Sequence, residues 1–188
     1  MKKIFLKKKQ GIGTVFVAAM LFAFGLVFLF YVDKKNTISE MKVKCEDALV
    51  SSTLAGALID VEEYGKDGDI IVPDYSECYQ NFKSCLDTNL KLDGNGNSEY
   101  TTFFASPIEV TDFIIYNVDK STGKITVLQG DGNSLISQYE TNLGSTYAPD
   151  GTYIENTSIY SKIKFEAKYS NLRTIQADKE CCVDITGR

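Results

Sequence analysis

The sequence predicts an α+β protein with a membrane-spanning helix near its N-terminus, and three observations indicate this fold class. Residues 11–32 carry no charge over 22 positions, which is enough for one helix to cross a hydrocarbon layer about 30 Å thick. Residues 33–91 then repeat apolar side chains every three or four positions, as amphipathic helices do. Beyond residue 107 the period shortens and becomes typical of strands. Helices followed by strands indicate an α+β fold with an antiparallel sheet.

Charge divides the chain into three expected regions: a cytoplasmic basic leader at 1–10, a transmembrane helix at 11–32 and an extracytoplasmic domain at 33–188. The leader has five lysines and no acid, whereas residues 11–188 have 15 basic against 25 acidic groups, a net charge of −10. Lysine-rich ends stay in the cytoplasm, so we expect a single-pass cell-membrane protein with its C-terminal domain extracellular. A cleaved secretory signal is the competing interpretation, but its apolar core is usually about 7–15 residues and precedes small residues.

Two helices are expected between the membrane and the sheet. The first continues from the span to about residue 64, because no proline or glycine lies between Val32 and Ala55. The second runs from Asp74, a good N-cap residue, to about Lys91. Their apolar stripes consist of Ile38, Met41, Cys45, Ala48, Ser52, Ala55 and Ile59 in the first helix, and of Tyr75, Cys78, Tyr79, Phe82, Cys85, Leu86 and Leu90 in the second.

Four strands are expected in the C-terminal half, at 107–118, 124–129, 157–169 and 172–186. The third alternates most regularly between apolar and charged side chains, which predicts a half-buried antiparallel strand. The segment 130–152 is rich in glycine, aspartate and asparagine and is expected to be a loop.

Residues 7–32 resemble the start of a type IV pilin or pseudopilin, in which a short basic leader closes on a glycine and a long helix leaves the membrane. The resemblance implies that a prepilin peptidase cuts after Gly11 and leaves Ile12 as the first mature residue. Five residues into the mature helix that family usually has a glutamate, and this chain has Phe16. The chain is most similar to the TadE-like proteins of tight-adherence pilus systems. Its 18 lysines against two arginines suggest a Gram-positive source.

The resemblance implies a structural or assembly function: a minor pilin, a pseudopilin or a TadE-like component of a pilus or secretion system at the cell surface. The implied partners are the lipid bilayer and other pilin-like subunits or the assembly machinery. Independently, the small residues Gly13, Ala19 and Ala23 allow close approach of helices within the membrane, although ordinary transmembrane composition explains them equally. A membrane-tethered extracellular binding module or sensor without catalytic activity is the alternative function.

Catalytic and cofactor chemistry finds little support in the sequence. The chain has no histidine, which removes the commonest general base and metal ligand, and it has no phosphate-binding or dinucleotide motif. The acidic region beyond the leader is unsuited to nucleic acid, whose phosphates require a basic surface. We therefore expect no enzyme activity, no cofactor and no nucleic-acid partner.

A weak calcium candidate lies between the second helix and the first strand. Asp93, Asn95, Asn97 and Glu99 place oxygen atoms at alternate positions, as calcium loops do. The glycine and glutamate that an EF-hand needs at its sixth and twelfth positions are absent. A turn built from Asp, Asn and Gly is the alternative interpretation.

The five cysteines are candidates for disulfides, since export permits them, and they form no zinc-type pair. Cys78 and Cys85 are seven residues apart on one expected helix, about 10.5 Å by helical rise, which exceeds disulfide reach. A bridge from Cys45 or Cys78 to Cys181 or Cys182 would tie the last strand to a helix. Buried free thiols are the alternative.

Overall fold

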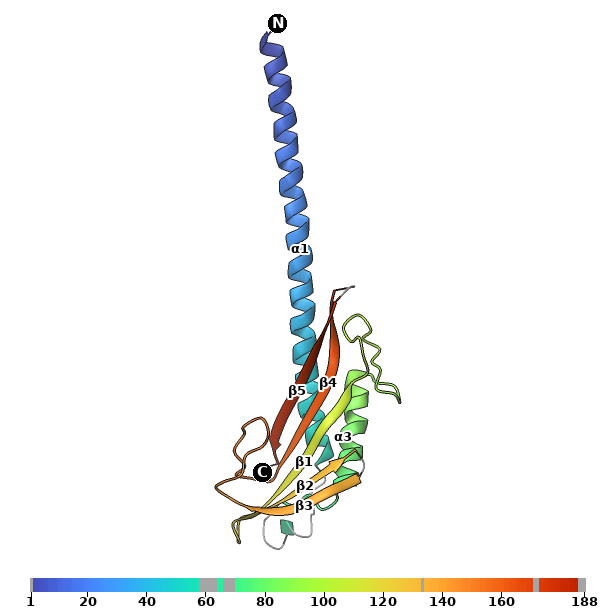
Figure 1. Cartoon of the computed structure of the whole chain (residues 1–188), viewed down its shortest axis with the longest axis vertical. Coiled ribbons are helices and arrows are strands. Elements are labelled where there is room, and N and C mark those ends of the chain that lie inside the picture. Colours follow the sequence, from blue (N-terminus) through green and yellow to red (C-terminus); the bar gives the residue numbers. More distant parts are fainter. Residues whose placement is uncertain (1, 58–63, 66–69, 133, 171–172, 186–188) are drawn as a thin grey trace. The chain divides into compact units, whose positions relative to one another are not determined.

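The computed structural model describes residues 2–57, 64–65, 70–132, 134–170 and 173–185, without the side chains of 2–12 and 169–170. The chain forms two compact units, Met1–Lys42 and Val43–Arg188. The expected α+β layout is confirmed: a long apolar N-terminal helix and a second helix precede a five-stranded antiparallel sheet (Figure 1).

The first helix, α1, extends over Lys2–Gly56. The expectation that it would continue to about residue 64 was wrong, because it ends at Gly56. The backbone of α3 passes very close there: a Cβ atom on Gly56 would lie 2.9 Å from the Cys78 carbonyl oxygen and 3.1 Å from Phe82 Cβ. Only glycine permits this approach without a shift. Ile59, assigned to the apolar stripe from the sequence, lies outside the described residues.

The second helix, α3, spans Tyr75–Leu90 and confirms the predicted helix almost residue for residue. Asp74 caps its start by accepting a hydrogen bond from the Glu77 N–H at 3.0 Å. Lys91 ends it in the left-handed conformation, with φ of 51°, a common way to close a helix. Its buried face carries Tyr75, Cys78, Tyr79, Phe82, Leu86 and Leu90.

The sheet contains β1 (Glu109–Asp119), β2 (Lys124–Asp131), β3 (Ser134–Asn142), β4 (Ser158–Ser170) and β5 (Arg173–Asp184). Their order is β3-β2-β1-β4-β5, and every neighbouring pair is antiparallel. Four of the strands lie where the sequence predicts them. The fifth, β3, falls inside the segment expected to be a loop, so that expectation was wrong over Ser134–Asn142. As an exposed edge strand, β3 lacks the buried apolar side chains that would reveal it in a sequence.

The sheet buries both of its faces against different parts of the chain. On one face the rings of Phe113 from β1 and Phe82 from α3 have centroids 4.8 Å apart. The residues that alternate with Phe113 form a second core with Ala148 and Ile154, which come from the loop after β3. This loop explains why Tyr160 is fully buried, although the alternation of 157–169 placed it on the polar side. The second core consists of Ile114, Tyr116, Val118, Ile125, Val127, Ala148, Ile154 and Tyr160.

Candidate functional site

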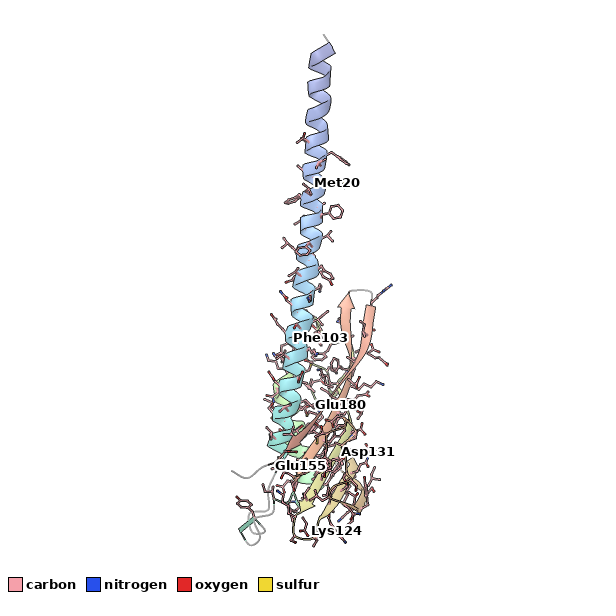
Figure 2. All side chains as sticks on the ribbon, turned by 90° about the vertical axis from the view of Figure 1, so that its left-hand side faces the viewer. Met20, Phe103, Lys124, Asp131, Glu155 and Glu180 are labelled. Atoms are coloured by element: carbon pink, nitrogen blue, oxygen red, sulfur yellow. The ribbon has the colours of Figure 1, made fainter. Side chains whose placement is uncertain are left out.

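The first candidate site is the apolar half of α1. All described side chains from residue 13 to Tyr31 are exposed, among them Phe22 at 70% and Phe30 at 71%, and those around Met20 project in several directions (Figure 2). An 18-residue window of this helix has a mean hydropathy of 2.7 and none of it is buried. Among the described residues, α1 is the one helix that is long and apolar enough to cross a membrane. An N-terminal signal sequence can have the same length and composition. So much apolar surface requires a cover other than water.

The small residues predicted to mediate helix packing all lie in this exposed part of α1. Ala19 and Ala23 are exposed, and a Cβ atom added at Gly13 would meet no atom within 4 Å. Any close packing against them therefore involves lipid or another chain. Gly11 and Ile12, the predicted cleavage position, also belong to α1, and their side chains lie outside the described ones.

The last part of α1, from Val43 to Gly56, is a structural element of the second unit. Cys45 and Leu49 are fully buried and Ala48 nearly so. Glu46 and Lys179 of β5 form an ion pair at 3.3 Å, and the Lys44 ammonium donates to the Tyr100 hydroxyl at 2.5 Å. The helix is therefore attached to the sheet by an apolar stripe with polar contacts on either side of it.

A cluster of three polar side chains lies inside this attachment, and we call it the polar seam: Thr53 of α1, Ser161 of β4 and Cys181 of β5. The Thr53 and Ser161 hydroxyl oxygens are 2.7 Å apart, and Cys181 Sγ lies 3.4 Å from the Ser161 oxygen. Thr53 also donates to the Leu49 carbonyl oxygen at 2.8 Å. Both hydroxyl residues are buried, and buried polar groups need such partners. In the sequence Ser161 is one position of the alternating strand expected at 157–169, and no local pattern indicates that it meets Thr53 and Cys181.

The calcium candidates form the turn that was the alternative interpretation. Asp93 Oδ1 accepts the backbone N–H groups of Asn95 at 2.9 Å and Asn97 at 2.8 Å, and the Asn97 side-chain amide donates to Oδ2 at 3.1 Å. These hydrogen bonds hold the pKa of Asp93 below its usual range, with the Asn97 amide as the largest cause. Glu99 is paired with Lys91 at 3.3 Å. A cation would have to compete with these partners. Within the described ranges no three Cys, Asp or Glu side chains are grouped to hold a metal.

All five cysteines have free thiols in the structure. Cys181 lies on the helix side of β5, beside Thr53, whereas Cys182 packs against the second core on the opposite side. Cys45 is eight residues before Thr53 on α1, about 12 Å by helical rise, so a Cys45–Cys181 bridge would need this part of the helix to move. Burial raises the pKa of Cys45 to about 11 and that of Cys78 to about 12. These two thiols pack as small apolar residues in the core.

A group of hydrogen-bonded polar and charged side chains lies on β4 and β5, on the sheet face that carries the second core. The Tyr160 hydroxyl donates to Glu180 Oε2 at 2.6 Å, and Lys162 lies 3.1 Å from Glu180 and 3.2 Å from Asp178. Burial, followed by the hydrogen bond to Glu180, raises the pKa of Tyr160 far above its usual value. Lys162 is thus shared by two carboxylates, and this ion pairing links β4 to β5.

Comparison with protein-family models, with curated proteins and with solved structures finds no match for this chain.

Proposed function

We propose that this protein is a membrane-anchored, pilin-like structural or assembly subunit: a minor pilin, a pseudopilin or a TadE-like component of a pilus or secretion system. In this proposal residues 11–32 anchor the chain, the N-terminus is cytoplasmic and the second unit is outside the cell. The observation that carries the proposal is the composition of α1 along its length. The same helix is apolar and exposed over residues 13–31 and packs against a folded sheet through residues 43–56.

Such a helix suits association more than chemistry. An apolar surface exposed all round gains free energy when it is buried, about 25 cal/mol for each Å² removed from water, and lipid and neighbouring helices both provide that burial. Ala19 and Ala23 offer a neighbour a close approach on one side of the helix. The polar interior of the second unit is hydrogen-bonded within the chain: every described buried side-chain nitrogen or oxygen has a partner.

The proposal is tested by self-association of the full chain in liposomes, measured by energy transfer between labelled copies. Ala19→Leu with Ala23→Leu should weaken association, because both changes fill the surface where a neighbouring helix would approach. Val17→Phe is the matched control, since it enlarges a side chain on the opposite side of the same helix. Monomeric behaviour of the unaltered chain would favour the alternative, a membrane-tethered binding module.

Processing is tested on the same preparation. The intact mass of the chain extracted from its native membrane gives its first residue. A chain that starts at Ile12 supports prepilin cleavage and incorporation into a filament. A chain that starts at Met1 supports a permanent anchor within an assembly platform.

A further inference from the structure

The two edges of the sheet carry the next inference. β3 and β5 are the terminal strands of the order β3-β2-β1-β4-β5, so each has one row of backbone N–H and C=O groups without a strand partner in the sheet. Natural edge strands are usually blocked by lysine, proline or several charges. The sequence of β3 contains neither lysine nor proline, and its single side chain charged at neutral pH is Glu140. Leu135, Ile136 and Tyr139 of β3 are 43, 71 and 50% exposed.

The direction of the strands restricts how two copies could join at these edges. Because all neighbours are antiparallel, β3 and β5 run in the same direction. The last part of α1 runs in this direction too. Glu46 contacts Lys179, and Thr53, which is later in α1, contacts Cys181, which is later in β5. Antiparallel pairing of two β3 strands would turn the α1 segment of one copy upside down. Parallel pairing of β3 with β5 of a second copy keeps both segments pointing the same way.

We infer that β3 of one copy pairs in parallel with the first half of β5 of a second copy. This inference rests on the proposed function and names the contact that assembly would use. The contact is heterologous, with different surfaces on the two partners, and can therefore repeat from copy to copy.

Side-chain chemistry selects the register of this pairing. On the helix side of β3 the residues are Leu135, Gln138 and Glu140, because a bulge places Leu135 opposite Gly130 and Gln138 opposite Leu128. On the same side of β5 they are Ile175, Ala177 and Lys179, in phase with Cys181, which contacts Thr53 of α1. Two exposed apolar side chains, Leu135 at 43% and Ile175 at 53%, then lie side by side. Glu140 and Lys179 are matched two positions after Gln138 and Ala177, beyond the bulge.

Two ion pairs within the chain would be joined by a third pair across this contact. Within one chain Glu140 pairs with Lys124 at 2.6 Å, and Lys179 pairs with Glu46 at 3.3 Å. The proposed register adds Glu140 to Lys179 of the next copy and produces a row of four alternating charges. Leu135 also borders a hollow of about 360 Å³ whose lining includes Pro73 and Leu128, so an apolar side chain from a neighbour has room there.

The register also predicts a shift between successive copies. Within one sheet a row of paired residues crosses all five strands and joins Ser137 of β3 to Cys182 of β5. The residues between them are Gln129, Ile114 and Tyr160. In the contact Ser137 lies beside Gln176, six residues earlier on β5, which corresponds to about 20 Å along the strands. The contact therefore displaces the second units of successive copies along the strand direction, as in a staggered array.

The test uses the full chain in detergent micelles, where copies are free to shift, with a photoreactive amino acid in place of Gln138. Illumination should cross-link this position to residues 173–181 of a second copy, as mapped by mass spectrometry of peptides. The same photoreactive residue at Glu155, in the exposed loop before β4, is the control and should give no such product. Cross-linking to β3 of the second copy, or to no chain, overturns the inference.

Charge reversal makes the test specific. Glu140→Lys and Lys179→Glu should each lower the cross-link yield about fivefold, because an opposite-charge pair becomes a like-charge pair. The double variant should recover most of the yield. Since Lys124 and Glu46 are unchanged, the double variant still has both pairs within the chain broken, and recovery can only come from between copies. Absence of recovery contradicts the register.

Failure of this inference and failure of the proposed function give different results. If labelled chains associate in liposomes but Gln138 does not cross-link to β5 in micelles, only the strand pairing is wrong. If the chains are monomeric in both media, the assembly function fails as well. In cells, capture of a different protein at Gln138 would assign this edge to another partner and overturn pairing between copies.

Discussion

Replacement of Thr53 by valine removes one hydroxyl from the polar seam and leaves the shape of the side chain almost unchanged. Thr53 is 1% exposed and Ser161 is 0% exposed. Without the partner at 2.7 Å, the Ser161 hydroxyl keeps only Cys181 Sγ at 3.4 Å, a weak partner. A buried polar group that loses its hydrogen bond costs about 1–3 kcal/mol.

We therefore expect Thr53→Val to lower the free energy of unfolding by about 1–2 kcal/mol, at the lower end of that range because the thiol remains. For a folded region of this size the midpoint of thermal unfolding should fall by about 3–8 °C. The assay is near-ultraviolet circular dichroism of the full chain in micelles. Thr37→Val is a matched control, because Thr37 makes the same hydrogen bond to the carbonyl four residues earlier, with Asp33 at 3.0 Å, on an exposed surface.

A double-mutant cycle isolates the contact itself. Ser161→Ala should cost less than Thr53→Val, because Thr53 still donates to Leu49. The double variant should cost less than the sum of the two by about 1 kcal/mol, since neither hydroxyl is then left alone. If Thr53→Val is no more destabilising than Thr37→Val, or if the two changes are additive, the seam does not attach α1 to the sheet.

Three further predictions concern the second unit. Gly130→Ala should destabilise it by about 1–3 kcal/mol, because the new Cβ would lie 2.2 Å from the Ser134 carbonyl oxygen and 2.5 Å from the Tyr75 ring; Gly94→Ala, where nothing lies within 4 Å, is the control, and equal urea midpoints would contradict the packing. Burial raises the pKa of the Cys45 thiol from 9.0 to about 11, so the unfolded chain loses this proton at a lower pH than the folded chain. The stabilisation from this thiol is complete below pH 9 and should be lost between pH 9 and 11. Urea unfolding over this range should show a smaller loss of stability in Cys45→Ala, and an equal loss in both proteins would contradict this prediction. Asn97→Ala should raise the pKa of Asp93 toward its usual value, as followed by NMR titration, because the Asn97 amide is the largest cause of its lowering; no change would show that the turn is held differently.

Periodicity predicted most of the fold. The span, α3 with its Asp74 cap, and β1, β2, β4 and β5 each repeat a chemical pattern that follows directly from helix or strand geometry. The end of α1 could not be predicted in this way. Gly56 lies against the backbone of α3 at Cys78, and a sequence does not say which helix crosses close to a given glycine.

β3 shows a second limit of sequence analysis. Its residues are mostly exposed, so no burial pattern distinguishes them from a loop, and the strand exists because β2 supplies its hydrogen-bonding partner. Tyr160 shows a third: a tyrosine placed among charged residues became part of a core because the loop carrying Ala148 and Ile154 covers it.

The candidate sites also differ in whether local sequence is enough to predict them. The exposed apolar helix follows from composition alone, and so does the Asp93 turn. The polar seam required three segments to meet that are far apart in sequence, at Thr53, Ser161 and Cys181. The proposed row of alternating charges between two copies likewise depends on strand order, which local patterns do not determine.

Digestion of intact cells with an external protease, followed by mass analysis of the membrane fraction, tests the central claim of an anchored extracellular domain most directly. We predict that the protease removes the second unit and leaves a membrane-protected N-terminal fragment that contains residues 13–32. A chain that stays intact until the cells are broken would place the domain inside. A domain released without protease, separated from its apolar helix, would show that residues 11–32 are a signal sequence and would contradict the anchor.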